Sequence, residues 1–508
     1  MMTTFLIART IDTASQMNLL GNMANRHGLI AGATGTGKTV TLRTMAEGFS
    51  RAGVPVFLVD VKGDLSGLSR AGVASGKIGE RMQEFGMTDD YLTGFPVRFW
   101  DVYGKDGIPV RVTISEMGSM LLTRLLNLND TQEGLLNLVF KVADDNGWHL
   151  LDLKDLKAML THVADNAKTY RTQYGNVSPA SVGAIQRQLL QLESEGGNDF
   201  FGEPELNLED WVQTEGGRGV INILNAQKLM LSPRLYSAFL LWFLAEIFER
   251  FPEVGDLDKP KFVLFFDEAH LMFDNASSAL TEQVEQVVRL IRSKGVGVYF
   301  VTQNPLDLPD AILGQLGNRV QHALRAFTPR DQKAVKAAAD TFRTNPNLHV
   351  ASAITELGVG EALVSFLDEK GMPNVVERAY ILPPASALSP LTVEECRASF
   401  ESDVLYRYYK DSVDNHSAFE ALAQLEAEQL AQKEEAEQDK AKSQSVQSSD
   451  KKELGVLDGF IGGLSGGRKS RNQGMAYDVA DALGSQLNKQ ATRAISRGLM
   501  GVIKNLLK

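Results

Sequence analysis

The stretch Gly32-Ala33-Thr34-Gly35-Thr36-Gly37-Lys38-Thr39 matches the pattern G-x-x-x-x-G-K-[ST] at every fixed position. A short apolar run, Leu29-Ile30-Ala31, precedes it. Apolar residues follow it at the helical spacing i, i+3, i+4 and i+7: Leu42, Met45, Ala46 and Phe49. Because the pattern carries weight only between a strand and a helix, this context predicts a phosphate-binding loop. The alternative is a glycine-rich turn that binds no ligand.

The residue types of this loop suit a nucleotide. Its glycines allow backbone angles that a Cβ would forbid, so that successive N–H groups can turn inward at a helix N-terminus. Lys38 is placed to reach the β- and γ-phosphates, and Thr39 to supply a hydroxyl to Mg²⁺. We therefore expect ATP and Mg²⁺ as cofactors. The residues expected to hold them are Gly32, Ala33, Thr34, Gly35, Thr36, Gly37, Lys38, Thr39 and Val40.

Composition places the chain among ordinary globular proteins of more than one domain. It has 508 residues, of which 44% are apolar and 23% charged. The most apolar segment, Phe239 to Phe248, is short and contains Glu246, so it predicts a buried helix and no membrane span. No secretory signal is apparent, and Cys396 is the single cysteine, which excludes an intrachain disulfide or a multi-cysteine zinc site. We expect a cytoplasmic protein.

The net charge of -11 is unevenly distributed. Residues 468–508 carry a net charge of +6, which leaves -17 for the rest of the chain. An acidic body argues against a continuous basic nucleic-acid surface, although a few lysines that line a pore would not show in this sum. The basic tail could bind an acidic partner, a membrane surface or the acidic body itself.

A second stretch, Lys261 to His270, places two acids at the end of an apolar run. Phe262 to Phe266 predicts a buried central strand, and Asp267-Glu268 follows it directly, which is the Walker B pattern. Asp267 could hold Mg²⁺, and Glu268 could orient or deprotonate the attacking water. The alternative is a buried strand that ends in two solvated acids. His270 has no second His or Cys at ligand spacing, which favours a structural or phosphate-sensing role over a metal-binding one.

Two further apolar runs lead polar residues to the same edge of a parallel sheet. The run Val54 to Asp60 is followed by Lys62 and Asp64, and these three charged residues either face the nucleotide or belong to a solvated turn. The run Val296 to Thr302 is followed by Gln303-Asn304. The amide of Gln303 could contact the γ-phosphate or the attacking water, or simply begin a loop.

Three arginines are candidates for an arginine finger, which neutralises charge on the γ-phosphate from a neighbouring subunit. They are Arg292, at the end of a helix, and Arg319 and Arg325, which we expect on one strand that begins at Asn318. Taken singly, such residues are more often solvated or salt-bridged.

The pattern as a whole predicts an α/β fold with a mainly parallel central sheet. Hairpins are expected at 96–114 and at 360–382, and a helix after Thr328-Pro329. The expected parts are a first part of the ATPase core at 1–115, a mainly helical insertion at 116–215, the rest of the core at 216–385, a helical and charged extension at 386–454, and a glycine-rich joint with a basic amphipathic helix at 455–508.

Four stretches together resemble the HerA/FtsK superfamily of P-loop ATPases. They are Gly-Ala-Thr-Gly-Thr-Gly-Lys-Thr, Val-Asp-Val-Lys-Gly-Asp, Phe-Phe-Asp-Glu-Ala-His and Val-Thr-Gln-Asn-Pro. The whole chain is most similar to the bacterial DUF853 or YjgR-like branch, which has a HerA-type helicase C-terminal domain. The resemblance implies a RecA-like sheet, ATP bound at subunit interfaces, and a homo-oligomer, most simply a hexameric ring, able to pump DNA or another polymer.

Carried over residue by residue, the resemblance gives catalytic roles to Lys38, Glu268 and Gln303. It assigns the metal to Thr39 and Asp267. Arg292 resembles the arginine that precedes the family's sensor strand. The chain departs from the archaeal helicases in lacking an N-terminal barrel, and from FtsK-type pumps in lacking membrane spans and a winged helix. These departures weaken the case for duplex unwinding and leave ATP hydrolysis intact.

Two classes of function follow. The first is an ATP-hydrolysing motor, such as a DNA translocase or a helicase-like protein. The second is a nucleotide-dependent oligomeric scaffold that moves no polymer. A small GTPase is a weaker third reading, because the chain has no Asn-Lys-x-Asp guanine-selecting motif.

Overall fold

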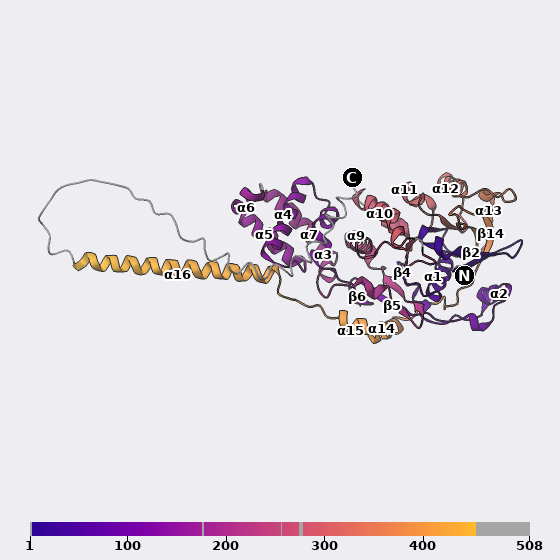
Figure 1. Cartoon of the computed structure of the whole chain (residues 1–508), viewed down its shortest axis with the longest axis horizontal. Coiled ribbons are helices and arrows are strands. Elements are labelled where there is room, and N and C mark those ends of the chain that lie inside the picture. Colours follow the sequence, from indigo (N-terminus) through magenta and orange to yellow (C-terminus); the bar gives the residue numbers. More distant parts are fainter. Residues whose placement is uncertain (1–2, 175–176, 256, 274–277, 454–508) are drawn as a thin grey trace. The chain divides into compact units, whose positions relative to one another are not determined.

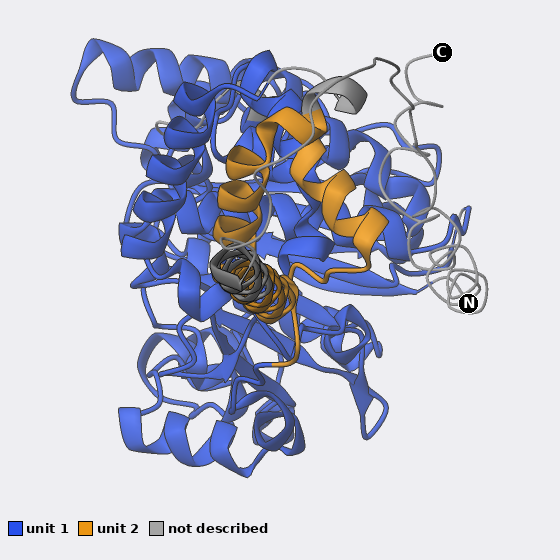
Figure 2. Cartoon of the chain, turned by 90° about the vertical axis from the view of Figure 1, so that its left-hand side faces the viewer, with its two compact units in different colours: residues 1–137, 151–153, 177–414 blue, residues 138–150, 154–176, 415–508 orange. Residues whose placement is uncertain are grey.

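A computed structural model describes residues 3–174, 177–255, 257–273 and 278–453. The chain folds into two compact units, shown in separate colours in Figure 2. Unit 1 comprises residues 1–137, 151–153 and 177–414, and unit 2 comprises residues 138–150, 154–176 and 415–508. The glycine-rich joint and the basic amphipathic helix expected at 455–508 lie outside the described residues.

Unit 1 is built on a twelve-stranded sheet in the order β2-β1-β14-β13-β12-β3-β11-β10-β4-β9-β5-β6. Its strands are β1 (Thr4–Thr10), β2 (Gln16–Leu20), β3 (Gly28–Ala31), β4 (Val56–Asp60), β5 (Val97–Asp101), β6 (Ile108–Pro109), β9 (Ile221–Asn225), β10 (Phe262–Phe266), β11 (Val296–Thr302), β12 (Asn318–Gln321), β13 (Glu361–Ser365) and β14 (Glu377–Ile381). Of these strands, Figure 1 labels β2, β4, β5, β6 and β14. From β12 to β6 every neighbouring pair is parallel, whereas β13, β14, β1 and β2 form an antiparallel edge. A separate short ribbon pairs β7 (Thr214–Glu215) with β8 (Arg218–Gly219). The predicted α/β fold with a mainly parallel sheet is confirmed.

Helices occupy the connections between the strands. Those in the described part of the chain are α1 (Lys38–Arg51), α2 (Gly76–Glu84), α3 (Ile114–Leu125), α4 (Asp130–Asn146), α5 (Leu153–Asp165), α6 (Ala167–Tyr174), α7 (Pro179–Ser194), α8 (Gly197–Phe200), α9 (Pro233–Arg250), α10 (Ser278–Ile291), α11 (Asp310–Leu313), α12 (Pro329–Asp340), α13 (Val350–Glu356), α14 (Val393–Ser402), α15 (Val404–Tyr409) and α16 (Ala418–Glu453). The predicted helix after Thr328-Pro329 is confirmed as α12, with Thr328 as its N-cap. Helices α3 to α8 fill most of 116–215, and the domain boundaries given above stay predictions.

Aromatic residues show how the two faces of the central strands are covered. On one face, Phe49 of α1 packs against Phe265 of β10 and Tyr299 of β11, with ring centroids 6.3 and 5.9 Å away. On the other face, Phe57 of β4 packs against Phe243 of α9 at 4.6 Å. Every residue of β4, β10 and β11 is buried, as the continuous apolar runs predict for parallel strands covered on both faces.

The expected hairpin at 96–114 is wrong, because β5 and β6 pair in parallel. The carboxylate of Asp101 explains the difference. It accepts hydrogen bonds from the backbone N–H groups of Tyr103 (3.1 Å), Lys105 (2.8 Å) and Asp106 (3.0 Å). These bonds wrap the loop around the end of β5, so that the chain crosses back and re-enters the sheet in the same direction. The glycines that favoured a hairpin serve this wrapped loop instead.

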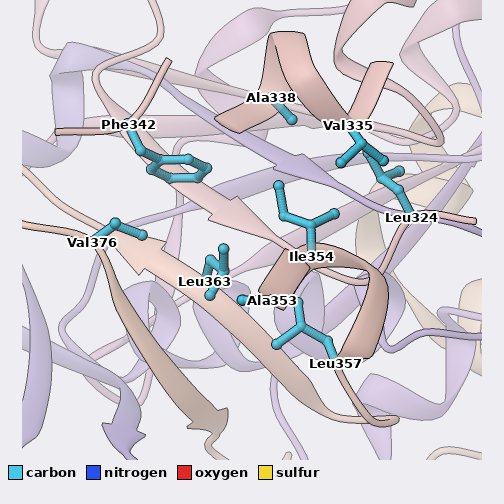
Figure 3. Packing of buried hydrophobic residues seen from close by; sticks show 9 residues of the cluster. All are labelled: Leu324, Val335, Ala338, Phe342, Ala353, Ile354, Leu357, Leu363 and Val376. Atoms are coloured by element: carbon cyan, nitrogen blue, oxygen red, sulfur yellow. The ribbon is translucent and has the colours of Figure 1, made fainter. Parts of the chain in front are cut away.

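The hairpin expected at 360–382 is confirmed, since β13 and β14 pair antiparallel. The strand expected to run from Asn318 through Arg325 is shorter and ends at Gln321. Beyond it, α12 and α13 form a small core against β13 (Figure 3). Its buried members are Leu324, Val335, Ala338, Phe342, Ala353, Ile354, Leu357, Leu363 and Val376. This satellite core fixes the position of the turn that precedes β13.

Unit 2 contains α5, α6 and the long α16. Two contacts attach the start of α16 to the start of α5. The backbone N–H of Phe419 donates to the carboxylate of Asp155 at 3.0 Å, and Lys154 pairs with Glu420 at 3.0 Å. The charged stretch expected at 433–454 to be a solvated helix or a linker is helical to Glu453. In the described ranges, no helix combines the length and the apolar character needed to span a membrane.

Candidate nucleotide-binding site

The phosphate-binding loop connects β3 to α1, as predicted. Gly35 and Gly37 have φ of +77° and +118°, a region that favours glycine. A Cβ at Gly35 would meet nothing within 4 Å, so space lies open in front of the loop. The Nζ of Lys38 donates to the carbonyl oxygens of Gly32 (2.7 Å) and Ala33 (3.2 Å). The loop thus has the cradle, the helix N-terminus and the cation that a polyphosphate requires.

His322, directly after β12, supports this loop from one side. A Cβ at Gly32 would come within 2.5 Å of the Cβ of His322, so only glycine fits there. The Nδ1 of His322 lies 2.9 Å from the carbonyl oxygen of Glu361, which can only accept, so Nδ1 carries the proton. Nε2 therefore accepts from the hydroxyl of Thr41 at 2.8 Å. Burial lowers the pKa of His322 to about 4, so the ring is neutral. Its two hydrogen bonds connect α1 to β13.

Asp267 and Glu268 lie on the opposite side of the loop, at the end of β10. Both are almost fully buried, with 4% and 5% of their surface exposed. Burial raises the pKa of Asp267 to about 7, and the nearby charge of Glu268 adds to this effect. A buried carboxylate of this kind gains from a cation placed beside it, which fits the expected Mg²⁺. Among the described residues no cluster of three or more His, Cys, Asp or Glu side chains could hold a metal alone. The remaining Mg²⁺ ligands would have to come from the nucleotide and water, as P-loop sites require.

Glu268 is held by three polar side chains. Lys62 contacts Oε1 at 2.5 Å, Gln303 donates to Oε2 at 3.2 Å, and His270 Nδ1 lies 3.4 Å from Oε2. Burial alone would raise the pKa of Glu268, but the hydrogen bonds from Lys62 and Gln303 outweigh it and lower the pKa. Its backbone is left-handed, with φ 47° and ψ 47°, which costs a non-glycine residue about 1–3 kcal/mol. The fold therefore fixes both the position and the ionised state of Glu268.

The sequence left open whether the charged residues at the end of β4 face the nucleotide or belong to a turn, and Asp60 and Lys62 differ in this respect. Asp60 accepts from the backbone N–H groups of Gly63 (2.7 Å) and Leu65 (3.0 Å), so it shapes the turn. Lys62 points to Glu268. After β11 the same division holds, since Gln303 faces Glu268 while Asn304 caps the following turn by accepting from the N–H of Leu306.

The three candidate arginines lie in different places. Arg292 precedes β11, at the opposite end of that seven-residue strand from Gln303, about 20 Å away along the sheet. The guanidinium of Arg319 donates to the carbonyl oxygens of Leu316 (3.0 Å) and Leu313 (3.1 Å) within its own subunit. Arg325 is exposed in the loop after β12. None of these positions places an arginine beside Glu268 of the same subunit, so a finger would have to act across an interface.

Sequence reasoning missed His322, Glu361 and Gly360. The N–H of Gly360 donates to the carbonyl oxygen of Thr36 at 3.1 Å, so the turn before β13 contacts the phosphate-binding loop directly. His322 could have been found from one signal, because it directly follows a strand that leads to the same sheet edge as the loop.

Comparison with known proteins places this chain in a family. The model for the helicase HerA-like C-terminal family matches residues 6–506. The chain belongs to this family.

Relatives of this HerA-like chain include two archaeal proteins named DNA double-strand break repair helicase HerA. The one from Sulfurisphaera tokodaii is 21% identical over 372 residues, which cover 71% of this chain and 66% of the relative. The one from Sulfolobus acidocaldarius is 25% identical over 146 residues, 28% of each protein. The chain therefore spans less than two thirds of the length of these relatives.

Among solved structures, the bacterial conjugative coupling protein TrwBdeltaN70, in its unbound form, superposes with a TM-score of 0.51 at 16% identity. The match covers 74% of this chain and 89% of that structure. At this level of identity the likeness concerns the fold, and it agrees with the expected RecA-like P-loop architecture.

Proposed function

We propose that this chain binds Mg²⁺ and ATP and hydrolyses the ATP as a HerA-like motor ATPase. The observation that carries the proposal is the placement of Glu268. It is ionised, buried and held by Lys62 and Gln303 at the sheet edge where the phosphate-binding loop begins. A water-activating carboxylate needs this combination of position and charge.

Each residue at the edge has a role in this proposal. The N–H groups from Gly35 to Val40 and the ammonium of Lys38 hold the phosphates. Thr39 and Asp267 hold Mg²⁺, which when bound neutralises charge on the β- and γ-phosphates. Glu268 accepts a proton from the attacking water, and Gln303 orients Glu268 and that water.

The active species we propose is a homo-oligomer, most simply a hexamer, with Arg292 acting on the site of the neighbouring subunit. The support is that Arg292 precedes β11, at the opposite end of that strand from Gln303 and the nucleotide edge, so it could reach a nucleotide only across a subunit interface. An arginine finger contributes about 10³–10⁵-fold to turnover in other P-loop enzymes.

Mixed oligomers test the shared site. Lys38→Ala and Arg292→Ala subunits should each be inactive, but mixing them creates interfaces with an intact Lys38 on one side and an intact Arg292 on the other. Activity in the mixture well above that of either variant alone is expected. A mixture no more active than its components, although it forms oligomers by mass measurement, would overturn the assignment of Arg292.

The relatives named as DNA repair helicases favour DNA as the polymer moved by this motor. The second candidate is a nucleotide-dependent scaffold without translocation, which the acidic body of the chain favours. Steady-state hydrolysis with and without single- and double-stranded DNA separates the two. A DNA motor is expected to hydrolyse ATP several-fold faster with DNA, whereas turnover that neither form of DNA changes would favour the scaffold.

A further inference from the structure

The two ends of the bound nucleotide can be assigned to the two sides of β3. The residues proposed to meet the γ-phosphate, Asp267, Glu268 and Gln303, follow β10 and β11, which lie on one side of β3 in the sheet. β12 and β13 lie on the other side. A nucleotide whose γ-phosphate is directed toward β10 and β11 must extend its ribose and base away from them, toward β12 and β13.

On that side, the turn before β13 lies against the phosphate-binding loop. The N–H of Gly360 bonds to Thr36, and a Cβ at Gly37 would come 3.3 Å from the nitrogen of Gly360. Val359, next in this turn, is 57% exposed although it is apolar. An apolar side chain exposed beside a phosphate-binding loop is a surface on which a base can rest.

Arg81 of α2 continues this surface. Its Nη2 lies 3.7 Å from where a Cβ of Gly360 would be, and its guanidinium lies over the ring of Tyr380, 3.7 Å from the centroid. Nη1 is paired with Glu84 at 2.8 Å, and only 18% of the side chain is exposed. The guanidinium of Arg81 is thus held over an aromatic ring at the edge of the turn, and guanidinium groups stack on bases in sites that bind nucleobases.

Hydrogen bonds, an ion pair and packing hold this turn in place without a ligand. Glu361 accepts from the N–H of Gly358 at 3.1 Å and pairs with Arg378 at 2.5 Å, and its carbonyl oxygen accepts from His322. Leu357 and Leu363, on either side of the turn, belong to the satellite core of Figure 3. A preformed surface binds with little ordering cost.

We propose that Arg81, stacked on Tyr380, and the Val359–Gly360 turn form the subsite for the base of the bound nucleotide. The proposal rests on the nucleotide-binding function proposed above. The contacts engage the faces of a base and not its edge, so the subsite takes purines as a class. ATP and GTP should bind within a few-fold of each other, and both more tightly than CTP, whose ring offers less stacking area.

Isothermal titration of the full-length protein in Mg²⁺ tests the subsite, with ATP, GTP, CTP and tripolyphosphate as probes. Arg81→Ala should weaken ATP binding about tenfold, the loss of one stacking contact, and leave tripolyphosphate binding unchanged. Tyr380→Leu, which removes the ring beneath the guanidinium, should act in the same direction.

Arg9→Ala is the matched control. Arg9 also lies over an aromatic ring, Phe85 at 4.8 Å, and donates to the carbonyl oxygen of Glu84 at 2.8 Å, so it supports the same helix without touching the turn. It should bind ATP like the wild type.

Three results would overturn the subsite: ATP binding by Arg81→Ala equal to wild type, equal losses for ATP and tripolyphosphate, or an equal loss in Arg9→Ala. Failure of the proposed function looks different, since the wild type would then bind neither ATP nor tripolyphosphate, or Lys38→Ala would bind both normally.

Discussion

The two flanks of the phosphate-binding loop use opposite kinds of chemistry. The catalytic flank, defined by Asp267, Glu268, Lys62 and Gln303, gathers charges, and the pKa values of both its carboxylates are shifted. The supporting flank, defined by His322, Gly360 and Glu361, meets the loop and α1 through a neutral imidazole and backbone groups.

This difference shows how the surroundings of one loop can provide both reactive charges and a fixed geometry. Under the proposed function, charge is concentrated where Mg²⁺ would bind and a proton would be transferred, since a low dielectric strengthens electrostatic interactions there. Neutral hydrogen bonds lie where the geometry of the loop must stay constant. If the buried ring of His322 gained a proton at working pH, the loop beside it would be disturbed. Substitutions on the catalytic flank should therefore change rates, and those on the supporting flank should change stability.

The largest effect is expected at Lys38, which lies between the flanks. Lys38→Ala should lower ATP hydrolysis at least about 100-fold and weaken ATP binding, because the ammonium that meets the phosphates is gone. A coupled assay of ADP release measures the rate. Lys370→Ala, which removes an exposed lysine on the β13–β14 hairpin, is the control. A Lys38→Ala rate within twofold of wild type would contradict the site.

A smaller effect is expected at Lys62. Its ammonium stabilises the ionised form of Glu268, so Lys62→Ala should raise the pKa of that carboxyl. In the role proposed for it, Glu268 acts as a base only when it is ionised, so the rate of the variant should fall more at acidic pH than at alkaline pH. We expect the acid limb of the pH–rate profile to move upward by about one pH unit, a tenfold loss at its foot.

Lys62→Arg keeps the charge and is the control for Lys62→Ala. It should leave the acid limb close to its wild-type position. If the alanine variant instead lost the same fraction of activity at every pH, Lys62 would act on something other than the ionisation of Glu268.

The smallest effect is expected at His322 and concerns stability. Its pKa is about 4 in the folded chain against 6.5 when unfolded, so between these values only the unfolded chain binds the proton. Stability is then fully present above about pH 6.5 and is lost as the pH falls toward 4. His322→Asn lacks this proton and should show a drop in Tm between about pH 7.5 and about pH 5 that is smaller by about 2–4 °C.

His416→Asn, at an exposed histidine, is the control and should show the wild-type drop in Tm. His27 is also buried, with its pKa lowered to about 4, and contributes the same dependence to all three proteins. An equal pH dependence of Tm in wild type and His322→Asn would show that the buried ring of His322 is not kept neutral by the fold.

The catalytic flank could be predicted from the sequence, because each of its parts follows a continuous apolar run. A continuous apolar run is typical of a parallel strand that is buried on both faces. Because the carboxyl ends of such strands meet at one edge of the sheet, the sequence alone predicts that Lys38, Asp267 and Gln303 lie close together. What the pattern left open was which polar residue after each strand faces the site. That choice depends on turn geometry, as Asp60 and Asn304 show.

The supporting flank was missed, and only His322 had a signal in the sequence, the strand that precedes it. His322 follows a strand of only four residues, and the hydrophobic pattern did not show that this strand ends at Gln321. Gly360 reaches the loop only because β13 pairs with β12, and β14 in turn with β1, about 370 residues away in the chain. Pairings at such separation leave no local signal. The wrong hairpin at 96–114 has a related cause, since one side chain, Asp101, decides the path of the loop.

The most direct test of the central claim is to measure ATP binding and ATP hydrolysis on the same preparation of Glu268→Gln. The amide keeps the shape of the side chain and cannot accept the proton from water. We predict an ATP dissociation constant within about twofold of wild type and a turnover at least about 100-fold lower. Hydrolysis at the wild-type rate would contradict the role assigned to Glu268 and, with it, the account of the catalytic flank.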